Sequence, residues 1–570
     1  MTSPSQFRLS HRLLKRRITT AWRLLSSGNF LDFLNHTFNF LLNQLKRRKK
    51  VSYKKWRKQF VELTDEERGL ISDQLEGINS GPSFTLIVEC DDSSIELIEE
   101  TLESLVGQHY TEWKVLIKNY ETKKSHLETI LNSFKDGRIS VYKTDADIQG
   151  SWVGLISSGD LLHEAALFAI AKTVIAEDEI KVVYTDNDHV DSKKRFIDPY
   201  MKPDWNSDLF AGTNYLGLLT FFARNVWEKS FSSIGSGHKA LVEAISEIDS
   251  RLIVHVPYVL ASKRVTNNKD HLQPEIVDVN YPLPIKPPRV SVLIPTRDKG
   301  KLLKRCLESV LEMTDYPDYE VVIIDHESSE PLARETIDEF GLKDNCVITS
   351  FEGEFNFSAM INRGVEKASG EVFVLLNNDT EVLQEFWLKS LICQVCREDV
   401  GVVGAVLLFS NNTIQHAGVH PNVDGLMGHG HKHWPAESNG YFGRLRIPHQ
   451  VAAVTGACLA IEKAVWYLVG GLDEGDLAVA YNDIDLCFKV RNVGLKIILD
   501  PRIRLLHHES ASRGFDNNPK AKARLTKEQD VMLSRWKDKM FLDPAYNPNL
   551  SFENTSFRLS VSKNTTKAFN

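Results

Sequence analysis

Short apolar runs alternate with amphipathic stretches along the C-terminal half of the chain. The runs are rich in Val, Ile and Leu, which is typical of buried strands, while the stretches between them repeat apolar residues at helical spacing. The predicted strands and helices, in order, are Val290–Pro295, Lys299–Glu312, Tyr319–Asp325, Pro331–Phe340, Cys346–Phe351, Ser358–Ala368, Val372–Asn377, Glu385–Cys396 and Val400–Leu408. This alternation predicts an α/β, Rossmann-like fold with helices on both faces of a mainly parallel sheet.

An earlier part of the chain repeats this pattern. The run Thr101–Tyr110 is similar to Cys306–Leu311, and Val153–Asp160 lines up with Val372–Asp379. Two copies of one domain explain a length of 570 residues, which is too long for one ordinary core. The predicted parts are a basic helical arm (1–80), a first α/β domain (83–265), a linker (266–288), a second α/β domain (289–515) and a helical or extended tail (516–570).

Charge is spread unevenly along the chain. The formal net charge of −7 gives no case for nucleic acid as a partner, but residues 1–58 hold fifteen Lys and Arg against one acid, Asp32. Apolar residues at helical spacing among these cations predict a helix on an anionic membrane surface. The alternative is an arm that packs on the acidic remainder of the protein.

No apolar run reaches the roughly 20 residues of a membrane-spanning helix, and basic residues interrupt the N-terminal apolar segment that a signal peptide would need. Seven scattered cysteines do not resemble a disulfide framework. Cys393 and Cys396 fall within a helical pattern, which favours core packing over a zinc site. We therefore expect a cytoplasmic protein, peripheral at the inner face of the cell membrane.

Polar residues follow the predicted strands at their carboxyl ends. Ligands of open α/β sheets bind at this edge, which selects the segment Pro295-Thr296-Arg297 together with Asp325 and Asp379. Asp483 opens a later predicted helix, and His507 and His508 follow another apolar run. Carboxylates with one imidazole suit Mg²⁺ or Mn²⁺, and a carboxylate kept free of the metal can act as a general base. Each acid taken alone is more typical of a structural role at a strand end or helix cap, and it is their joint order and placement that point to a site.

With these motifs in view, residues 288–515 resemble the family 2 glycosyltransferases of GT-A fold. Residues 83–550 as a whole look like the tandem-domain bacterial members of the polysaccharide or O-antigen type. The segments that carry the resemblance are Ile294–Asp298, Asp325, Phe355–Asn362, Asn377–Glu381, Thr413–Gly418, Tyr441–Arg444, Val454–Leu459, Asn482–Cys487, His507–Gly514 and Asp543–Asn549.

The resemblance implies roles for individual residues. Those implied to bind the nucleotide sugar are Pro295, Thr296, Arg297, Asp325, Asn362, Asn378 and Asp379. Asp379 and His507 are the implied ligands of Mg²⁺ or Mn²⁺, with His508 as the alternative to His507. Asp483 is the implied catalytic base, and Gly456, Ala457 and Asp485 are placed on the acceptor side. Asn377 and Asn482 depart from the family pattern, which has an Asp and a Glu there.

A further cluster, His429, His431 and His433, has a spacing that would align three imidazoles on a strand. We interpret it as a loop near the acceptor cleft, with a metal site as the alternative.

The first copy lacks most of this chemistry. Val88-Glu-Cys-Asp91 replaces the Ile-Pro-Thr-Arg segment, Lys118 or Asn119 stands for Asp325, and 236–240 has no pair of Asp residues. Only Asp160 matches Asp379. We predict a non-catalytic domain that binds acceptor or acts as a scaffold, with a second working transferase as the alternative.

The expected activity is inverting, metal-dependent transfer of a hexosyl or deoxyhexosyl group from a nucleotide-sugar donor. The expected acceptor is a saccharide or lipid-linked saccharide in cell-surface polysaccharide synthesis. Two alternatives remain. A carbohydrate-binding scaffold would have two inactive copies, against which the acids of the second copy argue. A nucleotidyltransferase would need a glycine-rich basic loop, of which Lys299-Gly300-Lys301 is only a faint version.

Overall fold

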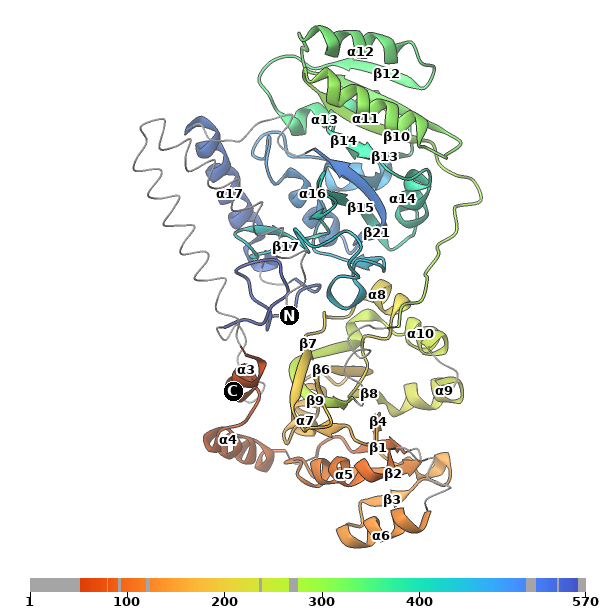
Figure 1. Ribbon diagram of the computed structural model, residues 1–570, viewed down its shortest axis with the longest axis vertical. Helices are drawn as coiled ribbons and strands as arrows, with labels where there is room; N and C mark the ends of the chain where they lie inside the picture. The colour runs from red at the N-terminus through yellow and green to blue at the C-terminus, as the bar shows by residue number, and fades with distance from the viewer. Residues whose placement is uncertain are drawn as a thin grey trace. The chain divides into compact units, whose positions relative to one another are not determined.

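The computed structural model describes residues 52–78, 80–90, 94–118, 124–234, 238–265, 275–508, 519–540 and 543–561 (Figure 1). The chain divides into two compact units, residues 1–59 and 60–570. In the first unit only residues 52–59 are described, which hold all but the last residue of helix α3 (Tyr53–Phe60), so most of the predicted membrane-binding segment lies outside the described residues. None of the helices in the described ranges has the length and apolar character needed to cross a bilayer.

Residues 60–570 contain two α/β domains in sequence. In the first, the strands are β1 (Phe84–Glu89), β2 (Trp113–Lys118), β3 (Ile139–Val141), β4 (Trp152–Ser157), β5 (Leu161–Leu162), β6 (Val182–Val190), β7 (Phe196–Tyr200), β8 (Thr220–Ala223) and β9 (Ile253–Arg264). Its helices are α4 (Asp65–Glu76), α5 (Ile98–Val106), α6 (Lys124–Phe134), α7 (Ala166–Ala176), α8 (Ser207–Gly212), α9 (Arg224–Ile234) and α10 (His238–Ser246).

The second domain follows residues 275–289, which form neither helix nor strand. Its strands are β10 (Val290–Thr296), β11 (Tyr319–Asp325), β12 (Cys346–Ser350), β13 (Val372–Leu376), β14 (Thr380–Val382), β15 (Val400–Leu408), β16 (Ile414–His416), β17 (Val419–Pro421), β18 (Met427–His429), β19 (His449–Gln450), β20 (Cys458–Glu462) and β21 (Lys496–His507). Its helices are α11 (Gly300–Glu312), α12 (Pro331–Gly341), α13 (Phe357–Lys367), α14 (Trp387–Val395), α15 (Lys463–Val469), α16 (Asn482–Asn492) and α17 (Pro519–Met540).

The two main sheets have the same strand order. The first runs β3-β2-β1-β4-β8-β6-β9-β5 and the second β12-β11-β10-β13-β20-β15-β21-β14, so each strand in one of these two series has a counterpart in the other. In both, the first four strands pair in parallel, and β8 or β20 then pairs antiparallel with the fourth. The predicted tandem α/β fold is confirmed, and the observed sheets are mixed because this antiparallel strand enters each of them.

The predicted arm ends earlier than residue 80. Helix α4 belongs to the second compact unit, and its Ile71 is fully buried in the core of the first α/β domain. The Arg68 guanidinium also pairs with the Glu164 carboxylate at 2.9 Å. A capping box formed by Thr64 and Glu67 starts this helix and is readable in the sequence as Thr-x-x-Glu. Thus residues 60–78 are part of the folded body.

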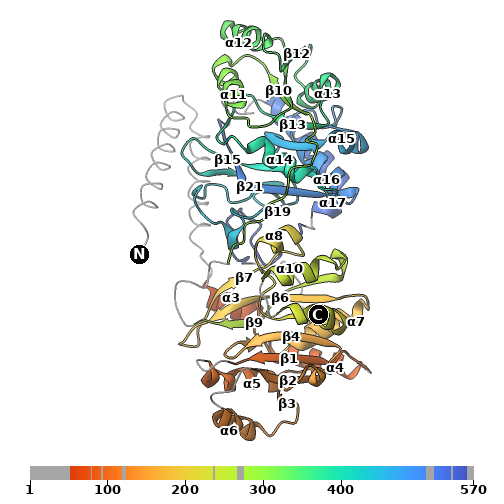
Figure 2. The same ribbon diagram turned by 90° about the vertical axis from the view of Figure 1, so that its right-hand side faces the viewer.

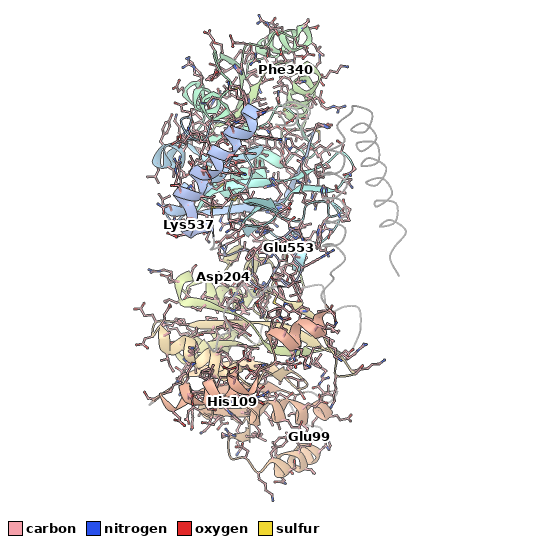
Figure 3. All side chains as sticks on the ribbon, turned by 90° about the vertical axis from the view of Figure 1, so that its left-hand side faces the viewer. Glu99, His109, Asp204, Phe340, Lys537 and Glu553 are labelled. Atoms are coloured by element: carbon pink, nitrogen blue, oxygen red, sulfur yellow. The ribbon has the colours of Figure 1, made fainter. Side chains whose placement is uncertain are left out.

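The predicted tail is part of both domains. Helix α17 runs beside α16 (Figures 1 and 2), and its Met532 is buried in the core of the second domain. Beyond α17, Asn547 donates its amide hydrogens to both carboxylate oxygens of Asp186 in the first domain, at 3.1 and 2.9 Å. The backbone N–H of Asp204, labelled in Figure 3, donates to the Pro544 carbonyl. The tail therefore holds the two α/β domains together.

Candidate functional site

A cavity of about 660 Å³ opens at the carboxyl ends of β10 and β13. Four of the predicted donor-binding residues line it, namely Pro295, Thr296, Arg297 and Asn378. Asn378 donates its side-chain N–H to Thr296 Oγ1 at 2.8 Å, which joins the turn after β13 to the end of β10. The expectation that ligands bind at the carboxyl ends of the strands therefore led to residues that line a cavity.

Asp325 lies on the neighbouring strand, in register with Thr296. It is not among the lining residues. Its Oδ1 accepts a hydrogen bond from the Ser328 N–H at 3.1 Å, and the next residue, Ser329, does line the cavity. Asp325 thus shapes the segment that forms one wall.

Asp379 and His507 face each other at the same edge of the sheet. His507 ends β21, where it pairs in register with Thr380, the residue after Asp379. Its Nε2 lies 3.1 Å from Asp379 Oδ1, and the Asp379 side chain is almost fully buried. The His507 Nδ1–H donates to Gln415 Oε1 at 2.7 Å, which turns Nε2 toward the carboxylate.

Mg²⁺ and Mn²⁺ fit this pair of donors. Both ions prefer oxygen ligands such as the Asp379 carboxylate, and they bind with few protein ligands when phosphate oxygens and water complete the shell. Within the described ranges, no cluster of three or more His, Cys, Asp or Glu side chains offers a fuller protein cage. Asn377, in place of the usual Asp, lines the cavity two residues away.

His508 points elsewhere, because adjacent side chains on extended backbone face opposite ways. Its Nε2 lies 3.2 Å from Glu381 Oε2, and its Nδ1 lies 3.4 Å from Ser410 Oγ. Geometry therefore favours His507 over His508 as the partner of Asp379.

Asp483 is the second residue of α16. Its Oδ2 accepts a hydrogen bond from the Gly456 N–H at 2.8 Å, and its Oδ1 accepts one from the Ile484 N–H at 2.9 Å. Burial raises the pKa of Asp483 above the usual aspartate range, while these two backbone donors oppose the shift. The next residue after Gly456 is Ala457, whose carbonyl accepts the Asn377 N–H at 3.1 Å. Gly456 and Ala457 therefore connect Asp483 to the turn that carries Asn378 and Asp379.

Asp485 and Asn362 have structural partners in place of the predicted contacts with substrates. The Asp485 carboxylate is fully buried and is held by Arg535 at 2.9 Å, Trp536 at 2.8 Å and Lys489 at 2.9 Å. It docks α17 on α16. The Asn362 amide exchanges hydrogen bonds with the Leu472 backbone at 3.0 and 3.3 Å and is absent from the cavity lining.

Of the three clustered histidines, His429 ends β18, while His431 and His433 lie in the turn that follows it, and the three rings have different partners. His429 Nδ1 lies 2.8 Å from His416 Nδ1, His431 Nε2 accepts the Tyr441 N–H at 2.9 Å, and the His433 ring stacks on Phe409. Left-handed backbone at His431 and His433 breaks the alternation of a strand. Burial lowers the pKa of His429 to about 4. They form no shared ligand set.

In the first copy, the residue that matches Asp379 is Asp160, and both of its carboxylate oxygens are hydrogen-bonded to the backbone. The two oxygens of Asp160 accept the backbone N–H groups of Arg264 and Ser157, each at 2.9 Å. Leu161 pairs with Ser262 where Thr380 pairs with His507, so a serine occupies the imidazole position. Burial raises the pKa of Asp160 to about 6. Helix α10, the counterpart of α16, has no acid in its first turn.

Sequence reasoning missed two side chains of the site. Gln415 lies within the Thr413–Gly418 segment, between Ile414 and His416 of a short buried strand, and its place in that segment was an available signal. Arg524 lines the cavity from α17, and nothing in the sequence distinguishes it from the other cations of that helix.

Residues 291–466 match the family described as Glycosyl transferase family 2. An uncharacterized protein of Sinorhizobium fredii is 33% identical over 547 residues, covering 86% of this chain and 60% of that protein. The O-antigen biosynthesis protein RfbC of Myxococcus xanthus is 29% identical over 534 residues, covering 83% of this chain and 41% of that protein.

One similar solved structure is the mannosyltransferase PcManGT from Pyrobaculum calidifontis in complex with GDP-Man and Mn²⁺. It has a TM-score of 0.33 and 18% identity, covering 45% of this chain and 67% of that chain. The chain spans less than two thirds of the length of either sequence relative.

Proposed function

We propose that the second α/β domain moves a sugar from a nucleoside diphosphate to an acceptor hydroxyl, because residues 291–466 match the family described as Glycosyl transferase family 2. The observation that carries this proposal is the placement of three groups at one sheet edge. These are the Asn378-lined cavity, the Asp379–His507 pair at 3.1 Å, and Asp483, which Gly456 holds beside the same turn.

The donor occupies the cavity in this proposal. A volume of about 660 Å³ lies within the usual range of small-ligand pockets. Pro295, Thr296 and Arg297 line the cavity at the end of β10, and Asn378 lies beside them, hydrogen-bonded to Thr296. These groups hold the nucleotide with its diphosphate toward the Asp379 turn.

Asp379 and His507 would hold Mg²⁺ or Mn²⁺, whose charge neutralises the leaving diphosphate. Asn377 contributes a neutral amide where relatives of this family carry an Asp, so the protein supplies one negative charge fewer to the ion. Gln415 fixes the His507 ring and thereby keeps Nε2 directed at the ion.

Asp483 acts as the general base. It removes the proton of the acceptor hydroxyl as that oxygen bonds to the anomeric carbon, while the bond from this carbon to the diphosphate oxygen breaks and the nucleoside diphosphate leaves. A single in-line displacement inverts the anomeric configuration. The raised pKa of Asp483 suits a group that must take up a proton, and its two backbone hydrogen bonds keep the carboxylate oriented.

The first α/β domain serves as a non-catalytic scaffold in this proposal. The Asp160 oxygens are occupied by backbone N–H groups, and Ser262 stands where a metal ligand would be needed. The Arg397–Asp208 ion pair at 2.6 Å and the tail join it to the transferase domain.

The wider setting we propose is synthesis of a cell-surface polysaccharide on a saccharide or lipid-linked saccharide, at the cytoplasmic face of the membrane. The similarity to a protein named for O-antigen biosynthesis supports the first part, and the fifteen cations of residues 1–58 support the second. Deleting residues 1–58 should abolish co-sedimentation with anionic vesicles. Unchanged partitioning would exclude the membrane role.

A panel of UDP-, GDP- and dTDP-sugars, with Mg²⁺ or Mn²⁺ and lipid or glycan acceptors, tests the activity. Wild type should release nucleoside diphosphate from at least one donor. Asp483→Asn should slow transfer by about 100- to 10,000-fold, the usual contribution of a general base. Asp476→Asn, the same change at an exposed acid, should leave the rate unchanged. Equal rates in wild type and Asp483→Asn would refute the assignment of the base.

A further inference from the structure

Helix α17 contributes a cation to the donor cavity although it lies outside the family match. The match covers residues 291–466, whereas Arg524 is on α17, which spans Pro519–Met540. Arg524 nevertheless lines the same cavity as Thr296 and Asn378. The cavity is therefore completed by a part of the chain that the shared family domain does not include.

Arg524 is held in place by a buried carboxylate one helical turn away. Glu528 is 1% exposed, and its Oε1 accepts the Val479 N–H at 2.9 Å. Its Oε2 lies 3.6 Å from Arg524 Nε. Val479 is itself a lining residue, so Glu528 ties both the guanidinium and the adjoining cavity wall to α17.

The helix that carries Arg524 is firmly docked. Arg535 and Trp536 bind the buried Asp485 of α16 at 2.9 and 2.8 Å, and Met532 is fully buried. The two helices lie alongside each other in Figures 1 and 2. Because the base Asp483 is on the same helix α16, Arg524 stands at a fixed position relative to it.

The charges that face the cavity favour an anion. The lining residues include three cations, Arg297, Lys299 and Arg524, and two acids, Asp298 and Glu330.

Both acids are engaged by backbone donors at the starts of α11 and α12. Asp298 accepts the N–H groups of Ser329 and Glu330 at 2.6 and 2.8 Å, and the Glu330 carboxylate accepts the Gly300 N–H at 2.9 Å. These hydrogen bonds lower the pKa of Asp298.

We propose that Arg524 binds the diphosphate of the nucleotide sugar and is the residue through which the site distinguishes diphosphates from monophosphates. This inference rests on the proposed function, since it takes the cavity to be the donor site. A guanidinium presents a planar fork of donors that matches two phosphate oxygens at once, and such charge-assisted bonds are the strong ones. With Asn377 in place of an Asp, more of the phosphate charge is left for a side chain to balance.

Calorimetry with Mn²⁺ tests the inference through binding alone. The ligands are UDP, GDP and dTDP and the matching monophosphates, measured on full-length wild type, Arg524→Gln, Arg524→Lys and Lys522→Gln. For the preferred base, Arg524→Gln should weaken diphosphate binding by about 10- to 100-fold, the usual worth of hydrogen bonds to a charged group. Monophosphate affinity should change by less than about threefold, which also shows that the variant is folded.

Lys522→Gln is the matched control, because it removes an exposed cation of the same helix two residues away. It should bind like wild type. Arg524→Lys should lie between wild type and Arg524→Gln, since a point charge replaces the fork. Diphosphate binding by Arg524→Gln equal to wild type would overturn the inference and leave the proposed function standing. Wild type that binds no nucleotide would overturn both.

Discussion

Nε2 of His507 lies 3.1 Å from Oδ1 of Asp379, while the imidazole of the adjacent His508 is turned to Glu381. The two histidines are adjacent in the chain, yet the His507 ring faces the buried Asp379 while the His508 ring faces the partly exposed Glu381.

The first prediction follows from this contrast. His507→Ala should weaken Mn²⁺ binding in the presence of nucleoside diphosphate by at least about 10-fold, since even residues that only orient metal ligands contribute that much. His508→Ala should stay within about twofold of wild type. Free Mn²⁺ counted by electron paramagnetic resonance gives both affinities. The reverse pattern would assign the ion to His508.

The second prediction compares the two copies. Asp379→Asn should reduce transfer by at least about 100-fold, because it removes the carboxylate that faces the ion and the leaving group. Asp160→Asn, the same change at the matching position of the first domain, should leave the transfer rate within about twofold. Steady-state rates with circular dichroism of both variants are the measurement. A folded Asp160→Asn protein without activity would make the first copy catalytic.

The third prediction separates Asp483 from Asp485, two positions along the same helix. Asp485→Asn should lower the unfolding midpoint of the protein strongly, because it leaves Arg535 and Lys489 without their buried carboxylate, a loss of about 3–5 kcal/mol in comparable pairs. Asp483→Asn should keep the midpoint near that of wild type while losing activity. A stable Asp485→Asn protein with weakened acceptor binding would restore the acceptor role predicted from the sequence.

The fourth prediction concerns pH and the first domain. His255 is buried between Asp186 at 2.9 Å and Asp204 at 3.0 Å. Burial alone would lower the pKa of His255, but the two carboxylates outweigh it and raise the pKa from 6.5 to about 9.

The protonated imidazole is therefore favoured in the folded state. Its stabilisation is complete below about pH 6.5 and is lost as the pH rises through about 9, up to about 3 kcal/mol in all. Urea unfolding at pH 6.5 and 9.5 should show this loss in wild type and in His126→Asn, an exposed histidine of the same domain. His255→Asn should show little of it, and an equal slope in that variant would contradict the assignment.

The sequence predicted the fold and the edge of the sheet well, because both depend on local patterns. Strand ends at Thr296, Asp325 and Leu376 follow from apolar runs that stop at polar residues, and parallel pairing brings those ends to one edge. The repeat was visible because similar short segments occur in the same order in both halves of the chain. The strand order shared by the two sheets confirms it.

What the sequence could not predict depends on partners far along the chain. Asp485 shares a motif with Asp483, yet its function is decided by Arg535 and Trp536 some 50 positions later. Asn362 likewise binds a loop 110 positions away. Motif membership places a residue near a site, but it does not tell which side of the helix the carboxylate or amide faces.

The contact between Asn547 and Asp186 has a consequence for how the protein folds during its synthesis. The two residues are 361 positions apart, and translation at about 5–20 residues per second separates their synthesis by roughly 20 to 70 seconds. For the later part of that interval the first domain is complete with Asp186 lacking its amide partner, while the second domain is still being made. The first domain therefore reaches its final stability only after the second domain is complete, so chains that stop early should be recognisable to cellular proteases at both domains.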